Sequence, residues 1–260
     1  MMRDKFTSKV VIVTGGASGI GLAISQGFAA EGASVEILDL NRSQMEKAAR
    51  DIRQQGGEVG VSVCDVANAQ EVDEVITAIR DRRGGIDILV NNAGIAHVGN
   101  AMTTSAEEFE RIQHVNVSGV ANCLRCVLRF MVEDDRGGVI LNLASTVAVS
   151  AIKDRFAYSA SKGAVLAMTY AVAKDFIEHK VRCNALLPGR VHTPFVDGFI
   201  KKNYPGKEKE KFKELSEAQP IGRMGTTEEI AAAALFLCSD QASFITGTAM
   251  PVDGGTLTIR

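Results

Sequence analysis

The feature that most constrains the fold of this chain is a repeated alternation between short β-branched runs and longer helical stretches. The runs are apolar without a clean two-residue alternation, which is typical of strands covered on both faces. Seven strands are predicted, at Val10–Val13, Val35–Leu38, Val59–Val63, Ile86–Val90, Val139–Leu143, Arg182–Leu187 and Ala249–Val252. Helices are predicted at Gly19–Glu31, Arg42–Gln55, Gln70–Asp81, Ala106–Val132, Tyr158–Glu178 and Thr227–Cys238. This repetition predicts an α/β fold with a doubly wound, mostly parallel sheet and helices on both faces.

Neither a composition break nor a low-complexity linker divides the 260 residues, so residues 1–260 are predicted to form a single domain. One segment differs, because residues 193–219 follow a strand end and are rich in lysine. Loops at strand ends of such folds carry function, so we predict a substrate lid of one or two short helices. The alternative is a solvated helical face on which the lysines pair with Glu208, Glu210 and Glu214.

Charge and cysteine content argue against several classes of function. With 29 basic and 31 acidic side chains the net charge is −2, which provides no global basic field for nucleic acid. Met1–Ser8 is too short and polar for a signal peptide, and no uninterrupted apolar run reaches the roughly 18 residues of a membrane span.

Five scattered cysteines indicate reduced thiols in the cytoplasm. Cys123 and Cys126 form a C-x-x-C inside a helical pattern, which favours packing over a metal site.

A glycine-rich turn, Thr14–Gly21, follows the first predicted strand and predicts a nucleotide site. Glycines let the backbone approach a pyrophosphate, and the helix N-terminus offers free N–H donors and the positive end of its dipole. Asp39 closes the second strand, where a carboxylate can bind the ribose hydroxyls of NAD and repel the 2′-phosphate of NADP. Arg42 lies three residues after Asp39 and is the residue that would favour NADP. The alternative role for Asp39 is to cap a helix or a turn. We therefore predict NAD, with NADP as the less favoured cofactor.

Two further segments end predicted strands. Asp65-Val66 ends the third strand and Asn91-Asn92-Ala93-Gly94 ends the fourth. Ligands of open α/β sheets bind at the carboxyl ends of the strands, so both segments are predicted to lie near the cofactor. A simple turn is the alternative for Asn91–Gly94.

Tyr158 and Lys162 are four residues apart in a predicted helix, so they project from one face, roughly 6 Å apart along the axis. A free tyrosine has a pKa of about 10 and is a poor base at neutral pH. A neighbouring ammonium favours the phenolate, so we expect it to lower the pKa of Tyr158. The pair is predicted to exchange a proton with an alcohol or a carbonyl.

In the order of its motifs the chain resembles the classical short-chain dehydrogenase/reductase family, from Val10 to Gly255. The matching motifs are Thr14–Gly21, Asn91–Gly94, Asn116 in a helix, Ser145 after the fifth strand, Tyr158 with Lys162, Pro188-Gly189 and Asp253-Gly254-Gly255. Many relatives carry two serines after the fifth strand, whereas this chain has Asn142-Leu143-Ala144-Ser145. Ser145 keeps the family's spacing of thirteen residues before Tyr158. The resemblance implies a single-domain Rossmann fold and an NAD(P)-dependent oxidoreductase that acts on CH–OH groups.

The resemblance also implies a role for each matching residue. Tyr158 is the general acid/base, Lys162 binds the nicotinamide ribose, and Ser145 hydrogen-bonds the substrate oxygen. Asn116 holds a water that connects Lys162 to solvent. The other cofactor-binding residues implied are Gly15, Ser18, Gly19, Ile20, Gly21, Asp39, Asp65, Val66, Asn92, Ala93, Gly94, Pro188, Gly189, Val191 and Thr193. A cap or a core polar residue is the alternative for Ser145 and for Asn116. No metal site is predicted.

Candidates for the substrate pocket, besides Ser145 and Tyr158, are His97, Val147, Arg155, Arg190 and His192. Arg155 precedes Tyr158 by three residues, and its guanidinium can hold a carboxylate in a forked pair. The two histidines can bond sugar hydroxyls, while a surface or subunit contact is the alternative for each candidate. Residues 192–206 resemble those of bacterial sugar and sugar-acid dehydrogenases of the family. We expect NAD-dependent hydride transfer involving a secondary alcohol or carbonyl of a sugar, sugar acid or polyol.

Two other functions share parts of this pattern. A 3-oxoacyl-[acyl-carrier-protein] reductase-like enzyme has every catalytic motif but usually prefers NADPH. An NAD-binding sensor without turnover typically loses the Tyr or the Lys of the pair, and this chain keeps both. The family resemblance further implies a homotetramer in which the helices Ala106–Val132 and Tyr158–Glu178 pack across an interface. Small residues of the second helix are compatible with that contact and equally with packing on the sheet, namely Ala157, Ala160, Gly163, Ala164 and Ala167.

Overall fold

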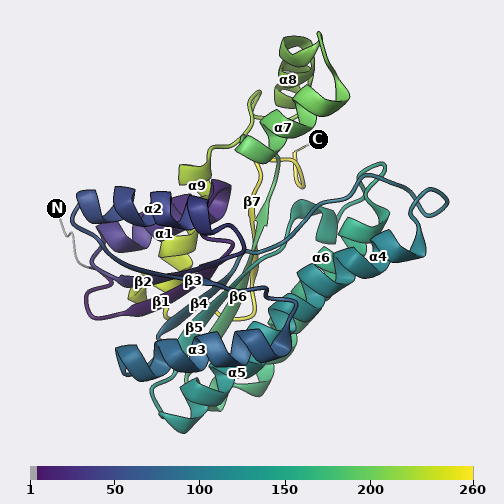
Figure 1. The fold of residues 1–260 in the computed structure, drawn as a ribbon. Coiled ribbons are helices and arrows are strands. Elements are labelled where there is room, and N and C mark those ends of the chain that lie inside the picture. Colours follow the sequence, from purple (N-terminus) through teal and green to yellow (C-terminus); the bar gives the residue numbers. More distant parts are fainter. Residues whose placement is uncertain (1–4, 260) are drawn as a thin grey trace.

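Seven parallel strands form one sheet in the order β3-β2-β1-β4-β5-β6-β7 (Figure 1). They are β1 Val10–Thr14, β2 Ser34–Asp39, β3 Glu58–Val63, β4 Ile88–Asn91, β5 Gly138–Leu143, β6 Val181–Pro188 and β7 Ala249–Val252. The computed structural model describes residues 5–259, and the side chains of all of these except Phe195, Lys202 and Asn203. The ends of the predicted domain, residues 1–4 and 260, lie outside the described residues. The predicted doubly wound Rossmann sheet is confirmed.

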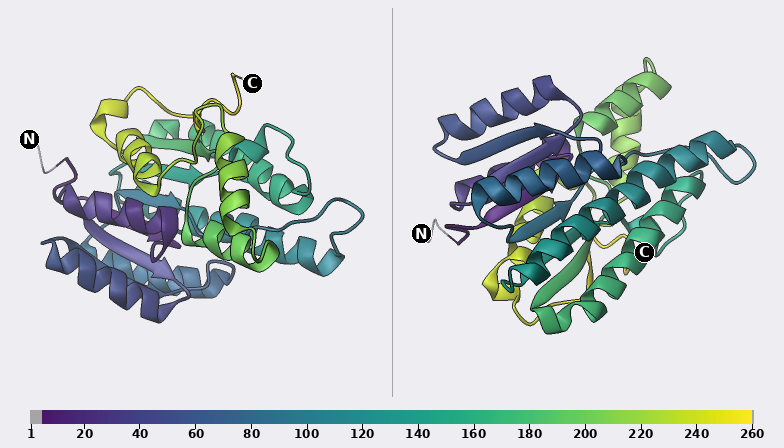
Figure 2. Two further views of the ribbon diagram at one scale, coloured as in Figure 1. Left: turned by 90° about the horizontal axis from the view of Figure 1, so that it is seen from above. Right: turned by 60° about the horizontal axis from the view of Figure 1, so that its bottom comes forward.

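Helices cover both faces of the sheet (Figures 1 and 2). They are α1 Gly19–Ala30, α2 Arg42–Gln54, α3 Ala69–Arg83, α4 Ala106–Gln113, α5 Gly119–Glu133, α6 Phe156–Asp175, α7 Pro194–Asn203, α8 Glu208–Glu217 and α9 Thr227–Cys238. One apolar core lies between the sheet and α3, α5 and α6, and a second lies between the sheet and α1, α2 and α9. Strands covered on both sides need no polar face, which explains their apolar sequences.

The strand order reverses between β1 and β4, because β2 and β3 lie on one side of β1 and the later strands on the other. Connections therefore leave the carboxyl ends of β1 and β4 in opposite directions and open a crevice there. The glycine turn follows β1 and the segment Asn91–Gly94 begins at the end of β4. The topology thus brings two predicted cofactor segments to one place.

Most elements begin or end one to three residues from the predicted positions, and three of the differences have a clear local feature. β4 begins at Ile88 rather than Ile86, because Gly84 and Gly85 turn the chain with φ of +76° and +149°. The helix predicted over Ala106–Val132 contains a π-helical turn, His114–Ser118, between α4 and α5. Helix α6 begins at Phe156, whose N–H donates to the Gly99 carbonyl oxygen at 3.0 Å.

The segment 193–219 forms α7 and α8, which extend beyond the sheet in Figure 1. Ile200, Leu215 and Met224 form a small apolar cluster of their own, apart from the two cores. Lys211 pairs with Glu214 at 2.6 Å on the exposed side of α8. Of the one or two short helices predicted, two are present. The alternative, a solvated face with paired lysines, is present in part, because Glu214 pairs with a lysine as that alternative expected.

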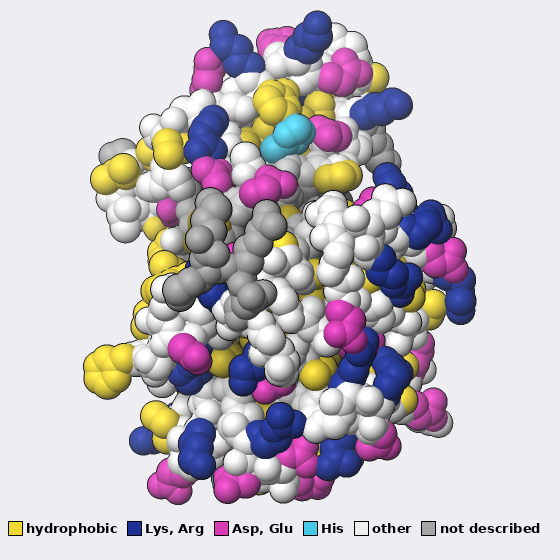
Figure 3. All heavy atoms as spheres, turned by 90° about the vertical axis from the view of Figure 1, so that its left-hand side faces the viewer, with side chains coloured by type: hydrophobic (Ala, Val, Ile, Leu, Met, Phe, Trp, Pro, Cys, Tyr) yellow, Lys and Arg dark blue, Asp and Glu magenta, His cyan; other side chains and the backbone are white. Residues whose placement is uncertain are grey.

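The long helical stretch Ala106–Glu133 is apolar enough to cross a membrane by length and composition alone. In the most apolar window of this stretch, 61% is buried inside the protein, as in a core helix. On the face shown in Figure 3, Lys and Arg side chains are interspersed with Asp and Glu over the coloured surface. That mixture agrees with the near-neutral net charge of −2.

Candidate active site

The turn between β1 and α1 requires glycine. Gly15 and Gly19 have φ of +62° and +52°, in the left-handed region that disfavours other residues. A Cβ on Gly21 would overlap the Gly15 carbonyl oxygen and the side-chain amide nitrogen, Nδ2, of Asn92. The turn therefore presents bare backbone in front of α1.

The N-terminus of α1 differs from those of α3, α4 and α9. Ser18 is the N-cap residue, but its side chain caps no N–H, and no acidic residue occupies the first turn. Asn68, Ser105 and Thr226, in contrast, cap α3, α4 and α9 through their side chains. Free N–H groups and the positive end of the helix dipole suit a phosphate. This turn fits the pyrophosphate of a dinucleotide.

Asp39 lies at the end of β2 and contacts the same turn. Its Oδ2 accepts a hydrogen bond from Ala17 N at 3.2 Å, and its Oδ1 accepts one from Asn41 N at 3.0 Å. The predicted alternative, a cap, is thus part of its role. Its side chain remains partly exposed, so the negative charge can still meet a ribose.

Asn92 and Thr14 join the end of β4 to the glycine turn. Thr14 Oγ1 accepts hydrogen bonds from the N–H groups of Asn92 and Ala93 at 3.0 and 3.1 Å. Asn92 Nδ2 donates to the carbonyl oxygens of Thr14 and Gly15, both at 3.0 Å. These bonds span the crevice, so the segment is more than a local turn. Thr14 was not predicted as a site residue, although its place at the head of the glycine motif was a signal.

Asp65 and Val66 follow β3, as predicted. Asp65 Oδ1 accepts a hydrogen bond from Ala67 N at 2.9 Å. The carbonyl oxygen of the buried Val66 accepts one from Asn122 Nδ2 of α5 at 2.9 Å. Asn122, which the sequence did not single out, thus fixes this segment from the neighbouring helix.

Asn116 lies in the π-helical turn between α4 and α5 and is fully buried. Its Oδ1 accepts from Ile95 N at 2.8 Å, and its Nδ2 donates to Ile95 O at 2.9 Å and to Ser161 Oγ at 3.0 Å. A Cβ on Gly94 would lie 3.2 Å from Asn116 Oδ1 and 3.6 Å from Lys162 Nζ. Asn116 and Lys162 therefore meet around Gly94. π-helical turns inside α-helices are frequent at functional sites.

Lys162 is only 6% exposed, and its Nζ donates to the Leu143 carbonyl oxygen at 2.6 Å. The same Nζ lies 5.8 Å from the centre of the Tyr158 ring. Burial removes water from the ammonium and lowers the pKa of Lys162 to about 8. The predicted adjacency of the pair is present.

The pKa of Tyr158 is raised, not lowered as the sequence predicted. Protein packed around the ring strips water from the phenolate and raises this pKa most. The neighbouring Ser145 side chain and the positive charge of Arg155 lower this pKa, but by less than burial raises it. The effect of burial thus outweighs the effects that favour the phenolate.

Ser145 follows β5 and lies beside Tyr158. Its Oγ accepts a hydrogen bond from Val147 N at 3.3 Å, which caps the 3₁₀ turn Thr146–Ala148. The same side chain lies close enough to Tyr158 to lower the pKa of its phenol. Ser145 is therefore both the cap that was the alternative and a neighbour of the phenol. Val147 is buried behind it.

Pro188 ends β6, and Gly189 packs against the chain after β7. Gly189 N donates to Val252 O at 3.0 Å, and a Cβ on Gly189 would lie 2.8 Å from Asp253 Cα. The terminal Asp253-Gly254-Gly255 motif thus has a structural role, which is to support the loop after β6.

Val191 and Thr193 continue this loop to the glycine turn. Val191 is buried, and Thr193 caps α7 by accepting a hydrogen bond from Val196 N at 3.4 Å. A Cβ on Gly19 would lie 3.7 Å from Thr193 Cγ2. The start of the segment 193–219 therefore adjoins the N-terminus of α1.

The two histidine candidates have different surroundings. His97 is 8% exposed, and its Nε2 hydrogen-bonds with Glu108 at 3.0 Å. Its carbonyl oxygen accepts a hydrogen bond from Arg155 Nη1 at 3.4 Å, so this segment also positions Arg155. His192 is exposed, with its Nε2 2.8 Å from Asp197 Oδ1.

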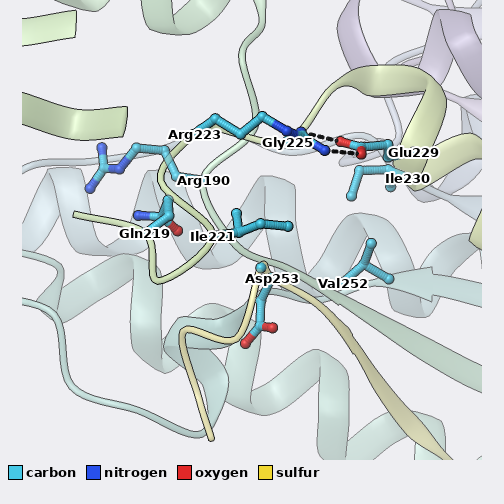
Figure 4. Close-up of a pocket in the computed structure, with 10 residues that line it drawn as sticks. Arg190, Gln219, Ile221, Arg223, Gly225, Glu229, Ile230, Val252 and Asp253 are labelled. Carbon is cyan, nitrogen blue, oxygen red and sulfur yellow. Dashed lines mark hydrogen bonds and ion pairs between the residues drawn. The ribbon is translucent and has the colours of Figure 1, made fainter. Parts of the chain in front are cut away.

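A cavity of about 120 Å³ lies at the base of the segment 193–219 (Figure 4). It is lined by Arg190, Gln219, Ile221, Arg223, Gly225, Glu229, Ile230, Val252, Asp253 and Gly254. Of the predicted site residues in the described chain, Arg190 alone contributes to its lining. This cavity is therefore distinct from the place where Ser145, Tyr158 and Lys162 meet.

All five cysteines are buried free thiols. Burial raises the pKa of Cys126 to about 11 and of Cys183 to about 12, so both stay protonated at neutral pH. Cys123 and Cys126 pack inside α5, as their helical pattern predicts. Across residues 5–259, no group of three or more His, Cys, Asp or Glu side chains is arranged to hold a metal ion.

Comparison with known proteins identifies the same family. Residues 15–257 match the family model of enoyl-(acyl carrier protein) reductases. Levodione reductase of Leifsonia aquatica is 35% identical over 254 residues, which is 96% of this chain and 95% of that protein.

Two solved structures with sugar-related names have the same fold. NAD⁺-bound xylitol dehydrogenase superposes with a TM-score of 0.90 at 33% identity, covering 97% of this chain and 100% of that one. L-Sorbose reductase from Gluconobacter frateurii, in complex with NADPH and L-sorbose, has a TM-score of 0.93 at 32% identity and covers 99% of both chains.

Motif, fold and relatives agree on the class of reaction. The family's proteins are NAD(P)-dependent dehydrogenases and reductases that act on CH–OH groups. From the match over residues 15–257 and the identity to its relatives, this chain belongs to the short-chain dehydrogenase/reductase family.

Proposed function

We propose that the protein transfers a hydride between NAD and a secondary alcohol or carbonyl of a sugar, sugar acid or polyol. The observation that carries this proposal is the convergence of Ser145, Tyr158 and Lys162 at the carboxyl end of β5. The dinucleotide turn lies at the same edge of the sheet, at the carboxyl end of β1, which β4 separates from β5. One region thus offers both a proton-transfer group and a place for the cofactor.

NAD, when bound, supplies the hydride chemistry that no side chain can provide. In reduction the neutral phenol of Tyr158, the form that its raised pKa favours, gives its proton to the carbonyl oxygen. In oxidation Tyr158 takes the proton from the substrate hydroxyl as phenolate. Ser145, which lies beside Tyr158, donates to the substrate oxygen as negative charge develops on that oxygen. Lys162 binds the ribose beside Tyr158, and Asn116 connects Lys162 to solvent through a water.

NAD is favoured over NADP because of Asp39. Its carboxylate lies beside the glycine turn, where the adenosine ribose of such cofactors binds. Of the two sugar-related structures, one holds NAD⁺ and the other NADPH, so the fold itself accepts both. We expect kcat/KM for NAD to exceed that for NADP. Asp39→Ser, which keeps a hydrogen-bond acceptor but removes the charge, should raise the relative kcat/KM for NADP.

The substrate class is supported by two independent features. Residues 192–206 resemble those of sugar and sugar-acid dehydrogenases, and two structural neighbours are named for xylitol and L-sorbose. Arg155, whose positive charge acts on Tyr158, adds a polar side chain that suits hydroxylated substrates better than large apolar ones.

A 3-oxoacyl-[acyl-carrier-protein] reductase-like activity is the second candidate, because the matching family model is described by acyl carrier protein chemistry. A cofactor-reduction screen separates the two candidates. It measures NAD or NADP reduction with sugars, sugar acids and polyols, and NADH or NADPH oxidation with acetoacetyl thioesters. Turnover confined to the thioesters, with a strong preference for NADPH, would replace the sugar proposal. Retention of both Tyr158 and Lys162 argues against a sensor without turnover.

We further propose a cytoplasmic homotetramer built from single domains, with α5 and α6 at a subunit interface. A groove of about 570 Å³ between these helices is lined mainly by apolar side chains, among them Leu124, Leu128 and Met168. Ala160 and Ala167 are exposed on α6, so the face of that helix is free for a partner helix.

The segment 193–219, which adjoins the glycine turn at Thr193, is proposed to be the substrate lid.

A further inference from the structure

A short parallel bridge joins Gly99, in the loop after β4, to Arg155, at the start of α6. Gly99 N donates to the Asp154 carbonyl oxygen, and the Gly99 carbonyl oxygen accepts from Phe156 N, both at 3.0 Å. Phe156 is the first residue of α6 and precedes Tyr158 by two residues. The backbone of Gly99 therefore holds the chain immediately before the proposed proton-transfer group.

The start of α6 has no side-chain cap. Arg155 is the N-cap residue, but its side chain caps no N–H. The N–H groups of a first turn lack partners within their own helix, and that of Phe156 is satisfied by Gly99 instead. Asp154 has a φ of +58°, a conformation that residues other than glycine rarely adopt unless their surroundings hold it. The orientation of the turn that carries Tyr158 thus depends on the position of Gly99.

The His97 ring lies against Gly99. His97 is 8% exposed, and a Cβ on Gly99 would lie 2.5 Å from His97 Cε1 and 2.8 Å from Thr104 Oγ1. No room for a methyl group therefore remains between the Gly99 backbone and these two side chains. A change in the position of the ring is expected to shift Gly99 and, through the bridge, the first turn of α6.

Glu108 of α4 fixes this ring. His97 Nε2 lies 3.0 Å from Glu108 Oε2, and because an ionised carboxylate only accepts, Nε2 is the donor. His97 Nδ1 is buried and has no hydrogen-bond partner among residues 5–259. One ring nitrogen is thus occupied and the other is closed off from solvent, so neither is free to bond a substrate hydroxyl. This arrangement favours a supporting role for His97 over the predicted role in the substrate pocket.

We propose that His97 is a positioning residue for Tyr158. Held by Glu108, its ring supports Gly99, and Gly99 orients the first turn of α6. His97 acts through these contacts and does not touch the substrate. The inference rests on the proposed function, because the proton transfer that it supports is the one assigned there to Tyr158.

The test compares His97→Leu, which fills space without a hydrogen-bond donor, with His97→Gln, whose amide nitrogen can take the place of Nε2. The substrates are the sugars, sugar acids, polyols and acetoacetyl thioesters of the cofactor-reduction screen that the unaltered protein turns over. In His97→Leu the single-turnover rate constant should fall at least about tenfold, because a small displacement of a reacting group strongly affects the rate. KM for the substrate and the dissociation constant of NADH should stay within about threefold. His97→Gln should recover part of the rate.

Glu108→Ala removes the partner of the ring from the other side. It should lower the single-turnover rate constant as well, and it should add little to the loss in His97→Leu, because both changes break the same hydrogen bond. Glu107→Ala is the matched control, since Glu107 is exposed in the same first turn of α4. It should leave the rate constant unchanged.

Three results would overturn the inference alone. They are an unchanged rate constant in both His97→Leu and Glu108→Ala, an equal loss in Glu107→Ala, and a loss confined to KM for sugars and polyols, which would make His97 a substrate contact. If His97→Leu does not fold, as thermal unfolding would show, His97→Gln and Glu108→Ala decide. Absence of turnover throughout the screen overturns the proposed function itself, and the inference with it.

Discussion

At the scale of single residues, removing the Tyr158 hydroxyl is the most direct test of the chemistry. Tyr158→Phe should lower kcat by about 10²–10⁴-fold, because a phenyl ring cannot exchange a proton with the substrate. Binding of NADH should stay within about twofold, since only one oxygen is lost. Steady-state kinetics and a fluorescence titration with NADH measure the two effects.

Tyr170→Phe is the matched control, because Tyr170 lies on the same helix, α6, and is 46% exposed. It should keep the activity of the unaltered protein. Retention of most of the activity by Tyr158→Phe, or an equal loss in Tyr170→Phe, would contradict the assigned role of Tyr158.

Lys162 should act against the stability of the fold. A folded-state pKa of about 8, against an ordinary value of 10.5, means that folding disfavours its charged form. This cost applies in full below about pH 8 and declines as the pH rises towards 10.5. Lys162→Met should therefore be inactive yet more stable at pH 7 by about 1–2 kcal/mol, after allowing for the lost bond to Leu143.

Urea unfolding of both proteins at several pH values checks this prediction. The stability of the unaltered protein should rise between about pH 8 and 9.5, so the advantage of Lys162→Met should shrink over that range. If Lys162→Met is no more stable than the unaltered protein, or if the difference in stability does not change with pH, burial of the Lys162 ammonium does not destabilise the fold.

The sequence predicted which side chains meet around Tyr158 but not how they ionise. Helical spacing alone places Lys162 one turn after Tyr158, and this adjacency is present. The direction of the Tyr158 pKa depends on the number of protein atoms around the phenol, which come from distant segments. Spacing along a helix contains no information about that burial.

At the scale of elements, the glycine turn and α1 act as a unit. Gly21→Ala should cost about 1–3 kcal/mol of stability and weaken NAD binding at least about tenfold. The reason is that the new methyl group would overlap the Gly15 carbonyl and the Asn92 amide, and so displace the turn. Thermal unfolding and a titration with NAD measure both losses.

Gly198→Ala on α7 is the control for stability, because no described heavy atom lies within 4 Å of the new methyl group. It should be neutral or stabilising by up to about 1 kcal/mol, since alanine favours a helix. Unchanged NAD binding in Gly21→Ala would show that the turn tolerates a side chain and would contradict the close packing described for it.

The long helical stretch before β5 shows what a local sequence pattern does not predict at the scale of elements. Its apolar periodicity predicted one helix over Ala106–Val132, and helical structure does extend over Ala106–Glu133. The π-helical turn at His114–Ser118 was missed. It accompanies the hydrogen bonds of Asn116 to Ile95 and Ser161, which belong to other segments, so no local pattern encodes it.

At the scale of the whole molecule, the proposed tetramer makes a distinct prediction. Ala167→Arg places a long charged side chain on the exposed face of α6, where it should separate the subunits without disturbing the fold. Sedimentation velocity should show a smaller assembly. Ala78→Arg, on the exposed face of α3, is the control and should sediment like the unaltered protein. Equal sedimentation of all three proteins would exclude α6 from the interface.

The sequence by itself determined the alternation of strands and helices, the glycine turn and the Tyr158–Lys162 pair, because each depends on neighbours within a few residues. Only the tertiary structure decided the bonds of Thr14 to the end of β4, the environment of the Tyr158 phenol, and the bonds of Asn116 to Ile95 and Ser161. These features join segments far apart in the chain, and the burial of a side chain arises only when the sheet brings those segments together.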